Sequence, residues 1–209
     1  MNPEDIIKEV AEEVSTCTMC ELHHSRKLAV PGEGPVNSDI MFIGEGPGFH
    51  ENEQGRPFVG AAGKFLEELL SDIGLSREEV FISNVVKCRP PGNRDPLPEE
   101  VETCTSTYLD RQIQAIDPKV IVTLGRFSMN LLLPNAKISQ VHGQPVKIRG
   151  RLVMPMYHPA AALHNGSLRP VIQQDFSKLP ELIAAAADSP KSEENKKKYE
   201  DEPKQLSLF

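Results

Sequence analysis

The stretch between residues 44 and 60, GEGPGFHENEQGRPFVG, gathers acidic side chains in a glycine-rich loop. It follows a short apolar run, DIMFIG, and leads into a segment with helical periodicity, which is the usual setting of a phosphate-binding loop. A phosphate site, however, offers backbone N–H groups and usually a lysine, whereas this loop carries Glu45, Glu51 and Glu53. Because carboxylates repel phosphate, the loop is predicted to hold a different kind of ligand.

The four cysteines form a second group of residues that could do chemistry. They are Cys17, Cys20, Cys88 and Cys104, in the pattern C-x2-C, a gap of 67 residues, then C-x15-C. A tight C-x2-C pair is typical of metal chelation, so the pattern favours a four-thiolate metal site. Zinc is more usually held by two tight pairs, and this spacing suits an iron–sulfur cluster at least as well. Unrelated buried thiols are the alternative interpretation.

Four short apolar runs are expected to position these groups. They lie at 39–44, 80–86, 120–125 and 151–157, and segments of helical periodicity lie between them at 60–73, 98–116 and 126–133. Continuous apolar strands that alternate with helices indicate a parallel sheet covered on both faces. We therefore expect an α/β protein, a three-layer α/β/α sandwich around a four-stranded, mainly parallel sheet.

Ligands of such sheets bind beyond the carboxyl ends of the strands. The segments at that edge are Gly44–Gly48, Asn84–Arg89, Gly125–Arg126 and His158–Pro159. Acid, amide and imidazole groups are therefore expected to converge on one cavity at this edge.

Composition limits the class of protein. The chain has 209 residues, of which 39% are hydrophobic, which is enough for one domain with a core. The formal net charge of −7 argues only superficially against nucleic acid, because many of the acids lie near the two ends of the chain. No apolar run approaches the roughly 18 residues that span a membrane, and no signal-peptide pattern begins the chain. We expect a cytoplasmic, nucleoid-associated monomer.

The chain changes character after residue 187. The segment KSEENKKKYEDEPK has almost no apolar content and is expected to be disordered. The predicted organisation is therefore a catalytic domain over residues 1–187 and a disordered tail over residues 188–209.

Several long motifs together resemble the family 4 uracil-DNA glycosylases, the iron–sulfur branch of the uracil-DNA glycosylase superfamily. The matching segments, in order over about residues 15–185, are CTMCELHHSR, VPGEGP, FIGEGPG, QGRPFVGAAG, ISNVVKCRPPGNRDPLPEE, VTLGR and YHPAAALHN. The resemblance implies a 4Fe–4S cluster on the four cysteines. It also implies hydrolysis of the N-glycosidic bond of uracil in DNA, which leaves an abasic site for base excision repair.

The resemblance implies roles for individual residues in that reaction. Cleavage develops positive charge on the sugar and negative charge on the departing uracil, and it requires the nucleotide to leave the base stack. Glu45 is implied to position the attacking water, and His158 to donate a hydrogen bond to uracil O2. Gly46 lets the backbone approach the base closely because it has no Cβ.

Further residues are implied to recognise the base. Asn84 can donate to uracil O4 and accept from N3–H, a pattern that cytosine reverses. Phe58 is implied to stack on the base, and Glu51 to lie near its C5 edge, where it excludes the thymine methyl group. Asn52 stands where the family commonly has a second acid, so no supporting role is expected there.

The loop after His158 is implied to contact DNA. Leu163 is the candidate wedge that fills the vacated stack, and Arg169 or Arg126 is the candidate phosphate contact. Residues beside the cysteines, namely Lys87, Arg89 and Arg94, are expected to form a patch that binds the DNA backbone.

The last five residues are Gln205, Leu206, Ser207, Leu208 and Phe209. They resemble the bacterial sliding-clamp-binding motif, with the three apolar side chains entering a hydrophobic groove and Gln205 bonding at its edge. The clamp is therefore an expected partner and a bacterium the expected source. The alternative is a tail that folds back on its own domain.

Two other functions compete with the monofunctional glycosylase. One is a uracil-recognising protein that traps the lesion without turnover, although the inserted basic loop of the related covalent branch is absent from VVKCRPPGNRDPLP. The other is an electron-transfer site with secondary DNA binding. A coupled lyase is not expected, because the matched pocket motifs hold no lysine for a Schiff base.

Overall fold

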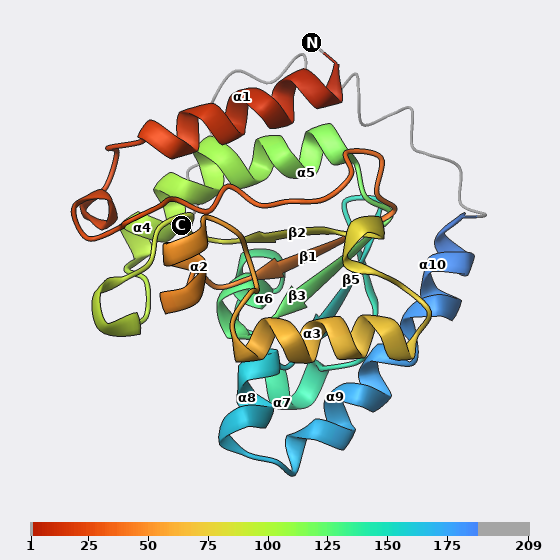
Figure 1. The fold of residues 1–209 in the computed structure, drawn as a ribbon. Helices are drawn as coiled ribbons and strands as arrows, with labels where there is room; N and C mark the ends of the chain where they lie inside the picture. The colour runs from red at the N-terminus through yellow and green to blue at the C-terminus, as the bar shows by residue number, and fades with distance from the viewer. Residues whose placement is uncertain (1, 188–209) are drawn as a thin grey trace.

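The computed structural model describes residues 2–187, which fold as alternating strands and helices (Figure 1). Five strands form one sheet in the order β2-β1-β3-β5-β4. Strands β1, β2, β3 and β5 are parallel, and β4 pairs antiparallel with β5 at one edge. Their bounds are Ile40–Gly44 (β1), Phe81–Asn84 (β2), Val120–Leu124 (β3), Val146–Ile148 (β4) and Arg151–Met156 (β5).

Helices connect the strands along the chain. They span Pro3–Thr16 (α1), Phe49–Gln54 (α2), Ala61–Asp72 (α3), Pro98–Cys104 (α4), Asp110–Ile116 (α5), Arg126–Leu132 (α6), Ile138–Val141 (α7), Pro159–His164 (α8), Leu168–Phe176 (α9) and Leu179–Ala187 (α10). A π-helical segment, Thr105–Leu109, joins α4 to α5, so the predicted helix over 98–116 is continuous but widens directly after Cys104.

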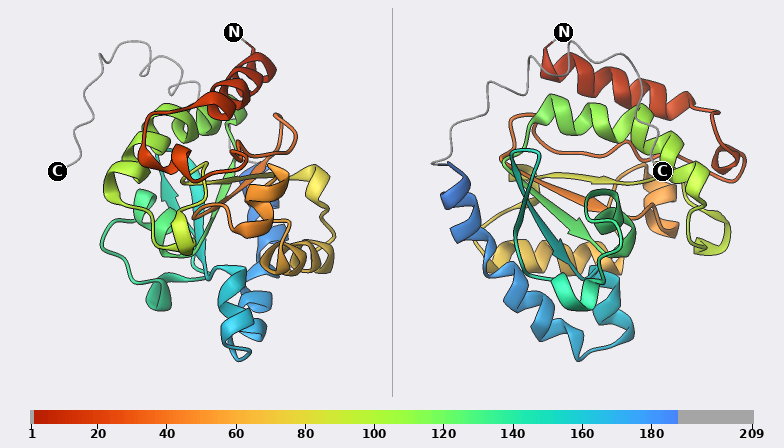
Figure 2. Two further views of the ribbon diagram at one scale, coloured as in Figure 1. Left: turned by 60° about the vertical axis from the view of Figure 1, so that its left-hand side comes forward. Right: turned by 180° about the vertical axis from the view of Figure 1, so that it is seen from behind.

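The sheet is the middle of three layers. Helices α1 and α5 lie on one face, and α3, α8 and α9 lie on the other (Figures 1 and 2). Alternation along β1 explains how one strand serves both layers, since Met41 and Ile43 pack with α1 and α5 while Phe42 packs with α3 and α9. The predicted α/β class and three-layer architecture are confirmed.

The predicted number of four strands is wrong, because β4 adds a fifth. It forms a hairpin with β5 through Arg149 and Gly150, whose φ angles are 47° and 81°, as a two-residue turn with positive φ at both positions requires. The strand escaped prediction because it is short and mostly exposed, so its residues carry no continuous apolar pattern.

Two further expectations concern the C-terminal tail and membrane-spanning helices. The predicted tail over residues 188–209, with its clamp-binding motif, lies outside the described residues. Within residues 2–187, no helix combines the length and apolar character that crossing a membrane needs.

Candidate functional site

The carboxyl ends of neighbouring parallel strands meet at one edge of the sheet. Gly44 at the end of β1 pairs with Asn84 at the end of β2. After β3, the N–H of Gly125 donates to the carbonyl of Met156 in β5 at 2.9 Å, which brings the segment that begins with Gly125 beside His158. The strand order therefore assembles an amide, two glycines and an imidazole from four separate parts of the sequence.

Asn84 has a buried amide oxygen without a hydrogen-bond partner among residues 2–187. The residue is 2% exposed, and its Oδ1 atom accepts no hydrogen bond from the described residues. An unpaired buried acceptor costs about 1–3 kcal/mol, so it is retained where a bound molecule supplies the missing donor. The geometry suits a ligand N–H.

Gly44 lies against the side chains of both Asn84 and Phe58. A Cβ atom on Gly44 would lie 2.7 Å from Cζ of Phe58 and closer still to Oδ1 of Asn84. The absence of a side chain at this position therefore lets the amide and the aromatic ring approach each other. The sequence places Gly44 at the ligand-binding edge but does not predict this close approach, since a glycine that ends a strand gives no sign of what it contacts.

Phe58 has a strained backbone that other residues hold in place. Its φ angle is 52°, which non-glycine residues rarely adopt. The guanidinium of Arg77 donates to the carbonyl of Phe58 at 2.8 Å and also to that of Pro57, and Glu33 pairs with Arg77. The ring stacks on that of His158, with centroids 5.4 Å apart and planes at 25°. Arg77 and Glu33 are further residues that sequence reasoning missed.

His158 is held as a neutral hydrogen-bond donor. Its Nδ1 accepts from the N–H of Ala160 at 3.1 Å at the start of α8, so the proton of the neutral ring lies on Nε2. Burial lowers the pKa of His158 to about 4, and the Glu51 carboxylate only partly opposes this effect. Gly125, with a φ angle of 89°, lies against the histidine, because a Cβ there would be 3.2 Å from Cβ of His158.

Glu45 is a half-buried carboxyl at the end of β1. Burial raises its pKa, the negative charge of Asp95 adds to the effect, and Arg126 opposes it. Its carbonyl accepts from the N–H of Val86 at 3.1 Å, which ties the β1 and β2 loops together. Gly46 packs against the same valine, since a Cβ on Gly46 would lie 2.7 Å from a Val86 methyl carbon. The missing side chain at Gly46 is thus already required by protein packing.

Glu51 uses its carboxylate to shape the loop. It accepts hydrogen bonds from the N–H groups of Val59 and Gly60, both at 2.9 Å, and of Gly48 at 3.1 Å. These bonds join the start of α2 to the start of α3. The neighbouring Asn52 is also structural, because its Oδ1 accepts from the N–H of Lys27 at 2.9 Å.

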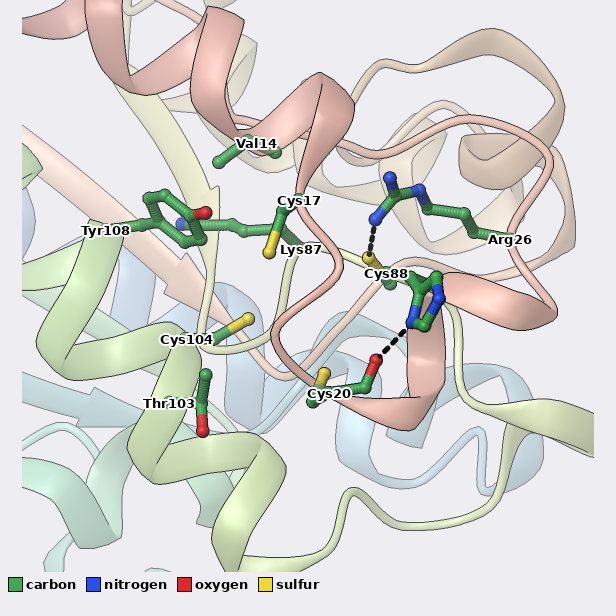
Figure 3. A pocket seen from close by; sticks show the side chains of 10 residues that line it. Val14, Cys17, Cys20, Arg26, Lys87, Cys88, Thr103, Cys104 and Tyr108 are labelled. Carbon is green, nitrogen blue, oxygen red and sulfur yellow. Dashed lines mark hydrogen bonds between the residues drawn. The ribbon is translucent and has the colours of Figure 1, made fainter.

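The four cysteines line one cavity (Figure 3). The cavity is small and partly open to solvent. Two N–H groups already point at sulfur, since Arg26 donates to Sγ of Cys88 at 3.3 Å and the Met19 backbone to Sγ of Cys17 at 3.5 Å. The complete lining is Val14, Cys17, Cys20, His23, Arg26, Lys87, Cys88, Thr103, Cys104 and Tyr108.

The cavity gathers four thiols, which are the usual donors of zinc and iron–sulfur sites. Within residues 2–187, no three Cys, His or acidic side chains are close enough together to hold one metal ion. A zinc ion needs all four ligands about 2.3 Å from one point, whereas a cluster spreads its thiolates over several iron atoms. Burial raises the pKa of Cys20 and Cys88, and that of Cys104 to about 11, so these thiols keep their protons until a cation displaces them.

The predicted DNA-binding patch is wrong for Lys87. This side chain is 1% exposed, and its ammonium bonds to three protein acceptors inside the molecule, so it cannot reach a phosphate. Burial lowers its pKa to about 7. Arg94 forms a two-pronged ion pair with Glu100, while Arg89 bonds to Asn93 at 2.7 Å and lies over the Phe49 ring.

The other predicted DNA contacts lie at the surface. Leu163 in α8 is 50% exposed, as a wedge must be. Arg169 pairs with Glu68 and lies over Phe65, and Arg126 pairs with Asp95. Phe49, at the start of α2, is a large exposed aromatic residue at the same edge of the sheet.

Comparison with known proteins identifies the family of the chain. Residues 31–180 match the model of the uracil DNA glycosylase superfamily. The chain is 48% identical over 190 residues to a type-4 uracil-DNA glycosylase of Sulfurisphaera tokodaii, covering 85% of each protein. It is 44% identical over 185 residues to that of Thermotoga maritima, covering 86% of this chain and 96% of the relative.

A more distant relative belongs to another type of uracil-DNA glycosylase. The type-5 uracil-DNA glycosylase of Pyrobaculum aerophilum is 33% identical over 149 residues, which cover 63% of this chain. The matches are thus longer and stronger with the type-4 proteins. The chain belongs to the uracil-DNA glycosylase superfamily and, within it, to the type-4 uracil-DNA glycosylases.

Proposed function

We propose that this protein is a monofunctional uracil-DNA glycosylase. It hydrolyses the bond between uracil N1 and the sugar C1′ in DNA, which releases free uracil and leaves an abasic site. The observation that carries the assignment is the unpaired Oδ1 of Asn84 beside Phe58, with a neutral imidazole stacked on the same ring. An amide acceptor, an aromatic face and an N–H donor are what a flipped uracil requires.

Departure of the base is the step that His158 assists. The electron pair of the C1′–N1 bond passes to uracil, and the resulting negative charge reaches O2. An Nε2–H donor aimed at that oxygen stabilises the anion more than the bound base, so it lowers the barrier. A neutral donor is supported by the bond from Ala160 to Nδ1 and by the pKa of about 4.

Asn84 reads the identity of the base. Its Oδ1 accepts from N3–H, and its amide N–H₂ donates to O4. Cytosine offers an acceptor at N3 and a donor at C4, so it would leave both partners unsatisfied at a cost of about 1–3 kcal/mol for each buried group. Phe58 supplies the stacking surface, and Glu51 holds the loop that carries it.

Glu45 acts on the sugar side of the bond. Its carboxylate stabilises the positive charge that develops at C1′ and orients the water whose oxygen adds there. The water loses a proton and the uracil anion gains one, so the reaction is a net hydrolysis. The half-buried position of this carboxyl supports the role, since a charge acts more strongly where water is scarce.

Cys17, Cys20, Cys88 and Cys104 hold a 4Fe–4S cluster in this proposal. The bound group supplies a cross-link between the segment after α1, the loop after β2 and the end of α4. The shared cavity and the N–H···S bonds from Arg26 and Met19 support this ligand set. Its contribution is structural, because it fixes the loop that begins at Asn84.

DNA is held at the edge of the sheet that carries the site. Leu163 fills the space that the flipped base leaves, and Arg89 and Arg169 contact phosphates. The exposure of Leu163 supports the first assignment. Arg169 exchanges Glu68 for phosphate on binding, which makes its contact weaker than that of an unpaired arginine.

The protein binds the bacterial sliding clamp through Gln205, Leu206, Leu208 and Phe209. It does so as a monomer. Three large apolar groups within four positions, after a polar stretch, favour a groove as their binding site. The polar stretch serves as a tether that raises the local concentration of enzyme at replicating DNA. Pull-down of purified clamp by the full chain, but not by a Leu208→Ala/Phe209→Ala variant, tests this partner.

A turnover assay tests the glycosylase itself. Oligonucleotides that carry U, T or C at one position are incubated with the protein, and free base is counted per protein molecule. We expect many uracil molecules per protein and no thymine or cytosine. A single gel-shifted adduct would identify a lesion trap instead, and release of no base would refute the assignment.

A further inference from the structure

Lys87 is a buried cation between the two functional regions. It follows Asn84 by three residues and precedes the metal-ligand candidate Cys88 by one. Its side chain lines the cysteine cavity, yet it is 1% exposed. Burying a charged group is costly unless its hydrogen bonds are replaced inside the protein, so the partners of this ammonium are informative.

Three acceptors surround the ammonium of Lys87. Nζ donates to Oγ of Ser83 at 2.7 Å, to Oε1 of Gln112 at 2.8 Å and to the main-chain carbonyl of Asn84 at 2.9 Å. An ammonium has three N–H donors, so each of them has a partner. The bond to the Asn84 carbonyl is the one that reaches the residue assigned to reading uracil.

The acceptors are themselves fixed to other parts of the fold. Gln112, which is 1% exposed on α5, donates through Nε2 to the Pro31 carbonyl at 2.7 Å. Its Oε1 also accepts from Ser83 of β2 at 3.0 Å. The ammonium thus joins the end of β2, helix α5 and the segment around Pro31 in one buried network, without a hydrogen bond to a substrate.

The backbone of Lys87 is fixed as well. Its carbonyl accepts from the N–H of Val30 at 2.8 Å, and the next residue directs its sulfur to the cysteine cavity. A displacement of Cys88 therefore moves Lys87, and a displacement of Lys87 moves the Asn84 carbonyl.

From these contacts we propose that Lys87 is a positioning residue for uracil recognition. Its ammonium fixes the main chain of Asn84, so that the amide is held at the orientation in which it accepts from uracil N3–H, and it links that orientation to the cysteine cavity. The inference rests on the proposed glycosylase function and adds a residue that contacts neither the base nor the sugar.

The test replaces Lys87 with methionine, which has a similar length and no N–H. Three quantities are measured in the full chain: kcat and KM on uracil DNA, the ratio of uracil to cytosine release, and inhibition by free uracil. We expect kcat to fall about tenfold to a hundredfold, as for loss of a group that orients a reacting geometry. KM for DNA changes little, because the phosphate contacts lie elsewhere, and about tenfold more uracil is needed for inhibition.

Variants of Gln112, a hydrogen-bond partner of Lys87, provide a second test if the Lys87→Met protein does not fold or lacks the absorbance of the cluster at about 400 nm. Gln112→Leu removes both the acceptor for Lys87 and the donor to the Pro31 carbonyl, whereas Gln112→Glu retains the acceptor and loses only the donor. The first is expected to lower kcat and weaken uracil inhibition, and the second to do so clearly less. In a folding Lys87→Met background, adding Gln112→Leu has little further effect, since both act through one network.

The outcomes separate the two proposals. A wild-type protein that releases no uracil overturns the glycosylase function and the positioning role together. An active wild type with Lys87→Met or Gln112→Leu variants that melt earlier, but keep kcat, base selectivity and uracil inhibition, overturns only the positioning role and makes the network purely structural.

Discussion

The site at the strand ends and the cysteine cavity are built in opposite ways. Gly44 and Asn84 end strands of the sheet and His158 lies two residues after one, so the hydrogen bonds between the strands place these residues relative to one another. The cysteines come from a loop after α1, a loop after β2 and the end of a helix, with few hydrogen bonds between these segments. Strand pairing places the residues of the first site, and Lys87 and Arg77 then hold the main chains of Asn84 and Phe58. The second site depends on what its thiols bind.

The two regions also differ in the kind of ligand that their unpaired polar groups favour. At the strand ends, Oδ1 of Asn84 has no hydrogen-bond donor among residues 2–187. A neutral base that binds reversibly would supply one. In the cavity, burial raises the pKa of three thiols, which favours a cation that stays bound. Changes at the first site should therefore alter the rate, and changes at the second should alter stability.

Replacing His158 with alanine is expected to have the largest effect on rate. Loss of one donor to a developing anion lowers kcat by about 10²–10³-fold. The absorbance at about 400 nm should stay near the wild-type value, because the candidate cluster ligands are untouched. The melting temperature should fall only slightly, because α8 loses the acceptor for the Ala160 N–H. His164→Ala, an exposed histidine on the same helix, is the matched control. Equal losses in both variants would locate the effect in helix α8 instead of the imidazole.

Replacing Cys88 with serine removes one candidate ligand from the cysteine cavity. We expect loss of the absorbance at about 400 nm and of several kcal/mol of stability, which lowers the melting temperature by roughly 10 °C or more. Protein that remains folded at low temperature should retain measurable uracil release, because the strand-end groups are still present. A variant that loses the cluster but keeps full stability and full activity would contradict the structural role of the cavity.

Gly44→Ala tests how closely the strand-end groups must pack. The added methyl group overlaps Oδ1 of Asn84 and the ring of Phe58, so we expect kcat on uracil DNA to fall about tenfold or more. Gly74→Ala is the control, because its φ angle of 75° strains an added side chain while nothing lies within 4 Å of it. The control should lose stability alone, and equal rate losses in both would exclude a local steric cause.

Much of the fold was predictable because apolar runs and parallel-sheet rules determine it. Those rules also indicated that Asn84 and His158 lie at one edge, since each lies at the carboxyl end of a predicted strand. The function and the identity of the group on the cysteines were implied instead by the long motifs, because no physical rule derives uracil from an amide and an imidazole alone.

The errors and omissions have a shared physical origin. Lys87 was expected at the surface because lysine is seldom buried, but its burial is decided by Gln112 and Ser83 on other elements. Arg77 lies 19 residues from Phe58 in sequence, and only the folded chain shows that it holds the Phe58 carbonyl. Contacts between distant segments determine such roles, and a sequence pattern records only neighbours.

The smallest predicted effect concerns the acid limb of activity, which should separate Glu45 from His158. Glu45 must be ionised to act, and its pKa is raised, so kcat/KM should fall with decreasing pH before the His158 pKa of about 4 is reached. Asp95→Asn removes a negative charge that raises the Glu45 pKa and should move this limb to lower pH. Because Asp95 is largely exposed, salt should weaken the shift. Glu45→Gln should lower the rate and abolish the limb, and a limb that persists unchanged in Glu45→Gln would assign the titration to another group.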